Sequence, residues 1–508
     1  MMSDYFTIRQ MLYKINAYFC KKEKTTNKST IMKTFMNKKL LVAVSALATV
    51  FSAQAQYLRT SYFMEGASTR VQMNPGLQPT RGYLNLPLIG SFNVTANTNS
   101  LGINDFMEIT KDGNDFLNNN KLYNSLQQDN RLNMNLNTNI LSFGWIKGKN
   151  FWSVNAGLRM DIGAQINKDM FTMMRNMNGF DIESVAGSKQ SYKMGNQSIN
   201  LNAYAEVGLG LSRRITEKLT VGARAKMLLG LARTEVNIEQ FDLDLDIPEV
   251  PNVEGMTQEE LMNYEFSESD WYGKGYSYNA KANVVTTLKG GGMTFDNNNM
   301  INGFDLDASS FGIAGTGFGI DLGASYSILK NLTVSAAVLD LGVMKWNKNN
   351  TTMAEVNGEE NVTINADNYE QYIGGELLSL DRFDFKKNEN ADYKTSTKLS
   401  TTVLLAAEYG LLNNKLSVGA VYSSRFVQPK TQTELTFLAT LRPSNAFNAA
   451  ISYSPILSGG KSFGLALKLG PIFAGTDYMY FGGNSKTING FIGLSLPLGG
   501  KRKPFSEL

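Results

Sequence analysis

Histidine is absent from the 508-residue chain, and cysteine occurs once, as Cys20. The lack of imidazole excludes a His-dependent catalytic triad, a His metal site and a histidine general base. A single cysteine excludes a disulfide framework and a zinc site built from thiolates. Carboxylates remain for acid–base work, but no pair stands at a defined catalytic spacing and no G-x-S-x-G motif accompanies them. We therefore expect neither an enzyme nor a cofactor.

Long apolar runs are also missing after residue 56, so we expect no membrane-spanning helix there. Before that point, Met36–Lys39 is basic, residues 40–52 are uncharged and mostly apolar, and Ala53-Gln54-Ala55 offers the small residues that a signal peptidase reads. We interpret 36–55 as a signal peptide cleaved near Ala55. A short membrane anchor is the alternative. Residues 1–35 are expected either to precede the true translation start or to form a long leader.

Charge of one sign does not dominate the chain, whose formal net charge is +4. Residues 1–55 hold nine Lys and Arg but two Asp and Glu, so the remainder carries 40 basic and 43 acidic residues. A mildly acidic exported chain is a poor partner for nucleic acid, and none is expected.

Strict alternation of apolar with polar or glycine residues is what the sequence has in abundance. Ile199, Leu201 and Ala203 alternate with Asn200 and Asn202, and the pattern continues to Leu211. Similar runs start at Trp152, Leu219 and Phe318. A period of two marks a strand whose two faces meet different surroundings.

These runs reach 9–13 residues, the length that a tilted strand needs to cross a bilayer, whereas strands of soluble sandwiches are usually about 5–6 residues long. Short polar turns such as 146–149, 216–218, 330–331 and 412–414 join them as hairpins. The prediction is an all-β transmembrane antiparallel barrel over 83–498, in the Gram-negative outer membrane, followed by a tail at 499–508. A soluble exported β protein is the alternative. About fourteen strands are expected: 83–97, 131–145, 150–163, 197–213, 218–238, 276–288, 315–329, 331–345, 397–411, 414–425, 431–442, 446–454, 461–470 and 485–498.

The longer connections are expected to be extracellular loops. Residues 235–270 contain twelve Asp and Glu and no Lys or Arg. Asp242, Asp244 and Asp246 are the candidates for a weak Ca²⁺-binding loop. They lack the Gly and the terminal Glu of an EF-hand, so a solvated, self-repelling loop is the competing interpretation.

Strand parity points eight charged side chains into the lumen, four of each sign. Balanced signs favour an interior rigidified by ion pairs over an ion-selective open pore. The expected lumen charge network consists of Arg159, Asp161, Glu206, Arg224, Lys226, Asp321, Glu408 and Lys468.

The segment before the first strand, residues 56–82, is aromatic, basic and interrupted by proline. A soluble tail is one interpretation, but disordered tails are seldom so aromatic. We predict an N-terminal hatch folded into the lumen, with Arg59, Tyr62, Phe63, Arg70, Asn74 and Pro75 as its key residues.

Several short motifs are similar to those of a known family of outer-membrane proteins. They are residues 59–65, 73–79 and 81–83, Val338–Gly342 followed by Trp346, and Gly470–Asp477. With the signal peptide and the Asn74-Pro75 segment, they resemble the long-chain fatty-acid transporter superfamily, and within it uncharacterised outer-membrane barrels of Bacteroidetes. Gly76 stands where the transporter pattern has Ala, and Leu508 replaces a common terminal aromatic residue.

The resemblance implies passive passage of a hydrophobic or small amphipathic compound. It also leaves a second function open, because barrels that look related act as partners of the type IX secretion system. The expected partners are therefore outer-membrane lipid and either a hydrophobic small molecule or a secretion-system or surface protein.

Overall fold

The computed structural model describes residues 59–85, 91–102, 104–105, 119–176, 185–249, 270–368, 385–389, 395–456, 460–479, 484–502 and 506. The expected leader and signal peptide, with Cys20, lie outside the described residues, as does part of the expected acidic loop.

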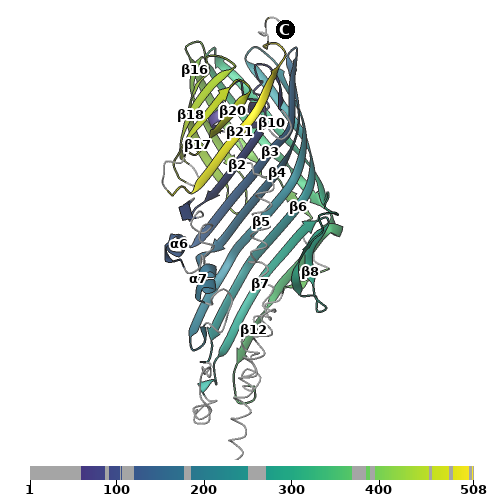
Figure 1. Cartoon of the computed structure of the whole chain (residues 1–508), viewed down its shortest axis with the longest axis vertical. Coiled ribbons are helices and arrows are strands. Elements are labelled where there is room, and N and C mark those ends of the chain that lie inside the picture. The colour runs from purple at the N-terminus through teal and green to yellow at the C-terminus, as the bar shows by residue number, and fades with distance from the viewer. Residues whose placement is uncertain are drawn as a thin grey trace, which may run out of the picture.

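Fourteen antiparallel strands close into a barrel, which confirms the expected fold class (Figure 1). Closure occurs where β1 and β2, which form one interrupted strand, pair with β3 on one side and with β21 on the other. β14 (Ser396–Lys398) continues β15. In spatial order, the barrel strands are β1 (Gly82–Asn85) with β2 (Ser91–Thr98), β3 (Asp129–Lys147), β4 (Asn150–Asn167), β5 (Lys189–Arg214), β6 (Leu219–Asp246), β10 (Gly315–Leu329), β11 (Leu332–Trp346), β15 (Thr402–Leu411), β16 (Leu416–Arg425), β17 (Gln432–Leu441), β18 (Phe447–Ile456), β19 (Ser462–Leu469), β20 (Ile472–Thr476) and β21 (Thr487–Leu498).

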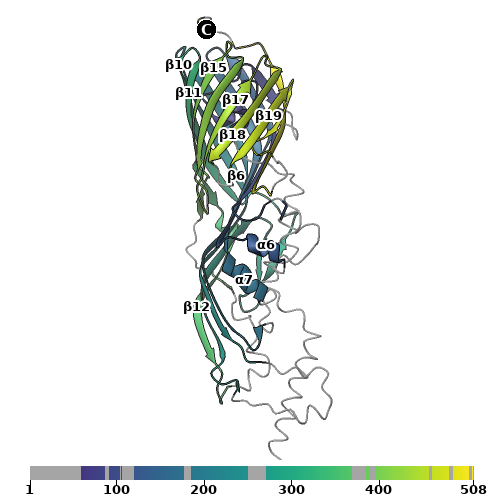
Figure 2. The same ribbon diagram turned by 90° about the vertical axis from the view of Figure 1, so that its left-hand side faces the viewer.

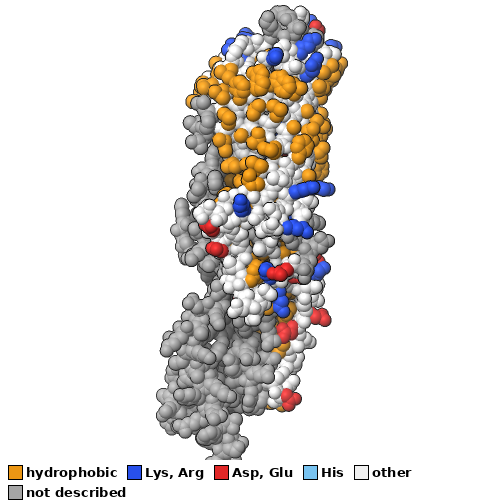
Figure 3. Space-filling view, turned by 90° about the vertical axis from the view of Figure 1, so that its right-hand side faces the viewer, with side chains coloured by type: hydrophobic (Ala, Val, Ile, Leu, Met, Phe, Trp, Pro, Cys, Tyr) orange, Lys and Arg blue, Asp and Glu red, His pale blue; other side chains and the backbone are white. Residues whose placement is uncertain are grey.

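The alternating pattern sorts side chains between the two faces of this wall. On β5, Leu209 is 52% exposed on the outside, whereas Glu206 is 1% exposed inside. Figure 3 shows the result on one face of the barrel, a band of hydrophobic side chains with Lys and Arg side chains beyond it at the end nearest the C-terminus. We call this end, where the tight turns lie, the short-turn end.

Helices are few and short among the described residues: η1 (Arg59–Ser61), α4 (Arg70–Met73), α6 (Asn120–Ser125), α7 (Lys168–Asn176) and η4 (Lys348–Asn350). The side chain of Asn119 caps α6 by accepting hydrogen bonds from the backbone N–H groups of Lys121 and Leu122. In the described part of the chain, no helix has both the length and the apolar character needed to span a membrane.

An extension of the sheet continues away from the short-turn end (Figures 1 and 2). β10 pairs with residues 219–230 of β6, and β7 (Gly275–Leu288) pairs with residues 232–246 beyond them. β12 (Thr351–Thr363) and β13 (Lys386–Lys387) widen this sheet, and β8 (Gly291–Phe295) and β9 (Ile301–Leu306) form a separate hairpin. The extension has its own core, in which Leu243, Leu245, Trp271 and Tyr276 are buried together.

Two strand predictions were wrong, although the total of fourteen was right. Residues 276–288 form β7, which belongs to the extension because β10 already occupies the barrel part of β6. Residues 472–476 were left out of the expected strands, but they form β20 and pair with both β19 and β21. The two errors cancel in the count.

Candidate functional site

The lumen is filled by residues 59–81, which belong to the segment 56–82 predicted to be a hatch, and we call residues 59–81 the hatch. Tyr62, Met64 and Asn74 have no exposed surface, and Phe63 and Met73 are 2% exposed. Two short helices, η1 and α4, make this segment compact enough to fit inside the barrel.

Asp477 holds the start of the hatch. Its carboxylate accepts hydrogen bonds from the backbone N–H of Thr60 at 2.8 Å and from the Thr60 hydroxyl at 2.6 Å. The Arg59 guanidinium donates to the Tyr478 hydroxyl at 2.6 Å and forms an ion pair with Glu434. Because these groups are buried, each hydrogen bond also satisfies a polar atom that water cannot reach.

The Asn74-Pro75-Gly76 segment presses against the inner wall. Asn74 Nδ2 donates to the carbonyl oxygens of Ala336 at 3.2 Å and Ala324 at 3.4 Å. Two wall glycines make room for it, because a Cβ on Gly323 would lie 2.1 Å from Asn74 Oδ1 and one on Gly222 would lie 2.1 Å from the Pro75 carbonyl oxygen. Glycine is required at both places for this close approach.

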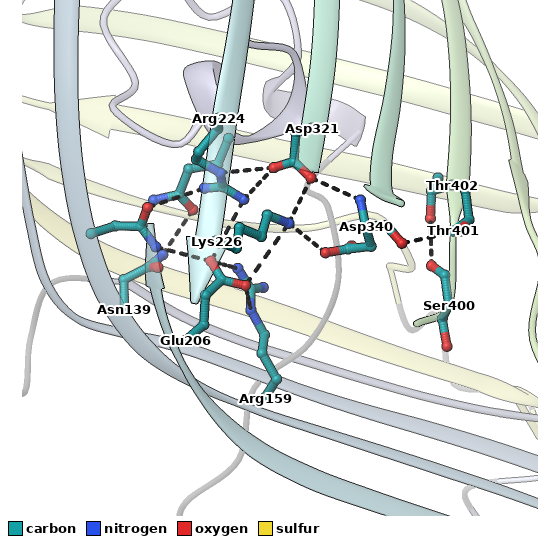
Figure 4. A network of polar contacts seen from close by, with 12 residues as sticks. Asn139, Arg159, Glu206, Arg224, Lys226, Asp321, Asp340, Ser400, Thr401 and Thr402 are labelled. Carbon is teal, nitrogen blue, oxygen red and sulfur yellow. Dashed lines mark hydrogen bonds and ion pairs between the residues drawn. The ribbon is translucent and has the colours of Figure 1, made fainter. Parts of the chain in front are cut away.

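Five of the eight predicted lumen charges meet in one connected cluster (Figure 4). Arg224 Nη2 lies 2.7 Å from Asp321, and Lys226 Nζ lies 2.6 Å from the same carboxylate. Arg159 pairs with Glu206 at 3.2 Å. Asp340, which was not predicted, pairs with Lys226. We call these six residues the lumen network, in which three acids face three bases.

Asp161 lies outside the lumen network and forms a bridge across the barrel. It pairs with Arg425 at 2.7 Å, so it joins β4 to β16, which lie far apart in the strand order. Ser400 lies 3.4 Å from the same carboxylate. The polar cavity left beside this bridge is only about 20 Å³, which is close to the volume of a single water molecule.

Glu408 and Lys468 lie apart from the lumen network. Glu408 pairs with Arg442 at 2.5 Å and lies 4.0 Å from the hatch residue Arg70. Lys468 Nζ donates to the backbone carbonyl oxygens of Asn445 at 2.9 Å and Gly470 at 2.5 Å. Both therefore act locally, at the short-turn end of the lumen.

An apolar part of the lumen lies beside the lumen network. Tyr62, Phe63, Met73 and Leu77 of the hatch pack against inward side chains of β11, β15, β16 and β17, which we call the apolar wall. The contributing wall residues are Ala337, Leu339, Leu404, Ala406, Val421 and Leu438. The lumen network thus lies on β4, β5, β6, β10 and β11, and the apolar wall adjoins it and packs against the hatch.

The predicted Ca²⁺ loop is wrong in its local structure. Asp242, Asp244 and Asp246 lie on strand β6, whose alternate side chains stand about 6–7 Å apart along one face. Asp246 pairs with Lys189, and Asp242 accepts a hydrogen bond from Gln240. The described residues contain no group of three acidic side chains arranged to hold a metal ion.

The residues that the sequence prediction missed are Asp340, Arg425, Glu434, Arg442, Asp477 and Tyr478. Arg425 and Glu434 have the inward parity of their strands, so a wider parity search would have found them. Asp477 and Tyr478 follow β20, the strand that was not predicted. Glu434, Arg442, Asp477 and Tyr478 hold the hatch in place, whereas Asp340 and Arg425 join barrel strands to one another. The geometry of these six residues assembles no nucleophile with a base.

One family model matches residues 75–477 and carries the description "Family of unknown function (DUF5723)". The chain belongs to this family. No curated protein matches the DUF5723 chain.

Solved structures with a similar fold include channels. The toluene transporter TbuX of Ralstonia pickettii is 12% identical, with 87% of this chain and 98% of that chain covered and a TM-score of 0.40. The toluene transporter TodX of Pseudomonas putida is 10% identical, with 87% and 95% covered and a TM-score of 0.35. The translocator domain of the autotransporter NalP from Neisseria meningitidis is 9% identical, with 86% and 99% covered and a TM-score of 0.32.

Proposed function

We propose that this chain is a gated outer-membrane barrel that passes a small hydrophobic compound between its hatch and its apolar wall. The observation that carries the proposal is the apolar contact between the hatch and the apolar wall. An apolar solute gains nothing from the ion pairs of the lumen network, whereas the surface shared by Tyr62, Phe63 and Leu404 offers it a dry path. The hatch fills this path, so passage requires the hatch to move.

The outer-membrane location rests on the outer surface. Leu209, Phe318, Ile451 and other large apolar residues are more than half exposed. The face drawn in Figure 3 carries a band of hydrophobic side chains. Apolar surface of that extent is stable when hydrocarbon rather than water covers it.

A reversible disulfide tests whether the hatch must move. The hydroxyl oxygens of Thr60 in the hatch and Ser452 in β18 lie 2.7 Å apart, so Thr60→Cys/Ser452→Cys places two thiols within bonding reach. The matched control is Thr436→Cys/Ser454→Cys, whose hydroxyls lie 2.8 Å apart on neighbouring wall strands. The lone native Cys20 lies in the predicted leader.

Uptake of a small apolar fluorescent dye is measured in cells that carry each variant in their outer membrane. We expect oxidation to stop the added uptake in the hatch variant, a reductant to restore it, and the control to match the native chain. Equal uptake in the oxidised and reduced hatch variant would refute passage by hatch movement.

The second candidate function is a closed scaffold for a secretion-system or surface-protein complex. The extension favours it, because a sheet with its own core, built around Leu243 and Trp271, is more than a passage needs. This function predicts no added dye uptake in any variant and a stoichiometric protein partner after mild extraction.

A further inference from the structure

A groove of about 550 Å³ indents the outer surface of the barrel across β10, β11, β15, β16 and β17. Its floor consists of four outward alanines, Ala324, Ala336, Ala407 and Ala420, and its sides include Tyr326 and Tyr422. In the strand register Ala324 lies opposite Ala336, and Ala407 lies opposite Ala420. Two facing pairs of small side chains thus make the depression between larger neighbours.

The four alanines lie at nearly one height. Each stands five or six residues from the nearest residue of its short turn, namely Lys330, Asn331, Leu412 or Lys415. With a rise of about 3.3 Å per residue and a tilt of about 40°, the floor lies roughly 12 Å above the turns. In a hydrocarbon core of about 30 Å, that height falls within the leaflet on the short-turn side.

The hatch supports the floor from inside. The carbonyl oxygens of Ala324 and Ala336 accept hydrogen bonds from Asn74, and a Cβ on Gly76 would lie 2.6 Å from Ala324 Cα. The wall therefore cannot move inward or relax at this place, and the groove is preformed. A preformed site binds without the cost of first ordering its walls.

Cations stand below the groove. Lys330 and Lys415 are exposed in the turns that end β10 and β15, and neither turn contains an acidic residue. An apolar groove at the depth of one leaflet, with lysines at its headgroup end, fits a lipid whose acyl chain is joined to a phosphate headgroup.

We propose that the outer groove binds one phospholipid of the leaflet on the short-turn side, with an acyl chain over the four alanines and the phosphate at Lys330 and Lys415. The proposal rests on the membrane location given above, but not on passage through the lumen. An acyl chain in the groove contacts protein on three sides and gains dispersion contacts that a flat wall does not offer.

The test fills the groove. The full chain is extracted from outer membrane in mild detergent and washed, and the phospholipid retained per barrel is counted by native mass spectrometry. The variants are Ala336→Leu/Ala407→Leu and Lys330→Gln/Lys415→Gln. The matched control is Ala225→Leu, an exposed outward alanine of β6 that does not line the groove.

We expect one retained phospholipid in the native chain and in Ala225→Leu. Filling the groove should lower the phospholipid retained per barrel about tenfold. That factor corresponds to a loss of about 1.4 kcal/mol in the free energy of lipid binding. The lysine variant should lose the lipid faster during washing. If the double leucine variant does not fold, Ala407→Leu alone should show a smaller loss in the same direction.

Equal retention in all variants would overturn the proposal, as would retention of a free hydrocarbon or of a protein in place of phospholipid. Insertion of the purified chain into liposomes separates the two claims. A chain that inserts but retains no lipid disproves the groove site alone, whereas a chain that stays soluble without detergent disproves the membrane location.

Discussion

Asp321 is the carboxylate on which the lumen network depends at the scale of single residues. It has no exposed surface and takes both Arg224 and Lys226 as partners. Removing one member of a buried ion pair leaves its partners charged in a place that water does not reach. Glu206 is the nearest alternative, but it lies 3.6 Å from Arg224 and 3.9 Å from Lys226 and already pairs with Arg159.

The first prediction follows from that arrangement. Asp321→Asn should lower the free energy of unfolding of the barrel by about 3–5 kcal/mol, measured by urea titration in lipid vesicles. Lys189→Gln is the control, since the Lys189 side chain is 82% exposed and its pair with Asp246 should contribute at most about 1 kcal/mol. Equal effects of the two substitutions would contradict the role given to the lumen network.

Gly222 supports a second prediction, since the Pro75 carbonyl oxygen occupies the space a side chain would need. Gly222→Ala should push the hatch off the wall and raise the conductance of the barrel in planar bilayers, with a loss of stability of about 1–3 kcal/mol from overpacking. Gly358→Ala in β12 is the control, because nothing lies within 4 Å of its added Cβ. Unchanged conductance in Gly222→Ala would show that the hatch does not limit flow.

Parity predicted many inward residues, and Asp340 shows where it fails. Along β11 the even positions Val334, Ala336 and Val338 face outward, so strict alternation places Asp340 outside as well. The ladder between β10 and β11 shifts register here, and Asp340 adopts φ of +56°. The bulge turns its carboxylate inward to Lys226. Alternation contains no information on where such a bulge falls.

At the scale of elements, the apolar wall departs from alternation in a way that the sequence shows. Residues 403–407, Val-Leu-Leu-Ala-Ala, are apolar without interruption. Leu405 is 50% exposed on the outside, whereas Leu404 is buried against the hatch. Both faces are apolar because lipid is expected on one and the hatch covers the other. Such a run marks the strand on which an internal segment packs.

The extension could not be foreseen from the same pattern. β7 alternates much as a barrel strand does, because one of its faces covers the core around Tyr276 and the other meets solvent. Strand pairing decides its place, because β10 pairs with residues 219–230 of β6 and β7 pairs with residues 232–246. Strand partners so distant in sequence cannot be read from local periodicity.

A third prediction concerns this element alone. Leu243 is 1% exposed within the core of the extension, so Leu243→Ala should destabilise the extension by about 2–5 kcal/mol. Limited proteolysis should then cut within 232–246 or 275–288, while the barrel keeps its resistance to heat in detergent. Asp244→Asn, on the exposed face of the same strand, should behave like the native chain. Collapse of the whole barrel in Leu243→Ala would mean that the two parts fold as one.

Across the whole molecule, three surroundings meet on a wall one strand thick. Hydrophobic side chains form a band outside, the lumen network occupies one part of the interior, and the hatch covers the apolar wall beside it (Figures 3 and 4). The fold class followed from alternation, because every barrel strand separates two of these surroundings. The occupant of the lumen followed only as a hypothesis, since aromatic content does not say where a segment packs.

The outer band leads to the last prediction, for which Leu209 is suited because it is 52% exposed and five residues from the end of β5. Leu209→Arg should lower the stability of the inserted barrel by about 2–4 kcal/mol if this height lies near the bilayer midplane. Ile215→Arg, at an exposed apolar position in the short turn, should cost about 0–1 kcal/mol, because an interfacial arginine reaches water. Urea titration in vesicles measures both. A small loss at Leu209 and a large one at Ile215 would reverse the assignment of depth and move the membrane away from the band on which the outer groove and the passage both depend.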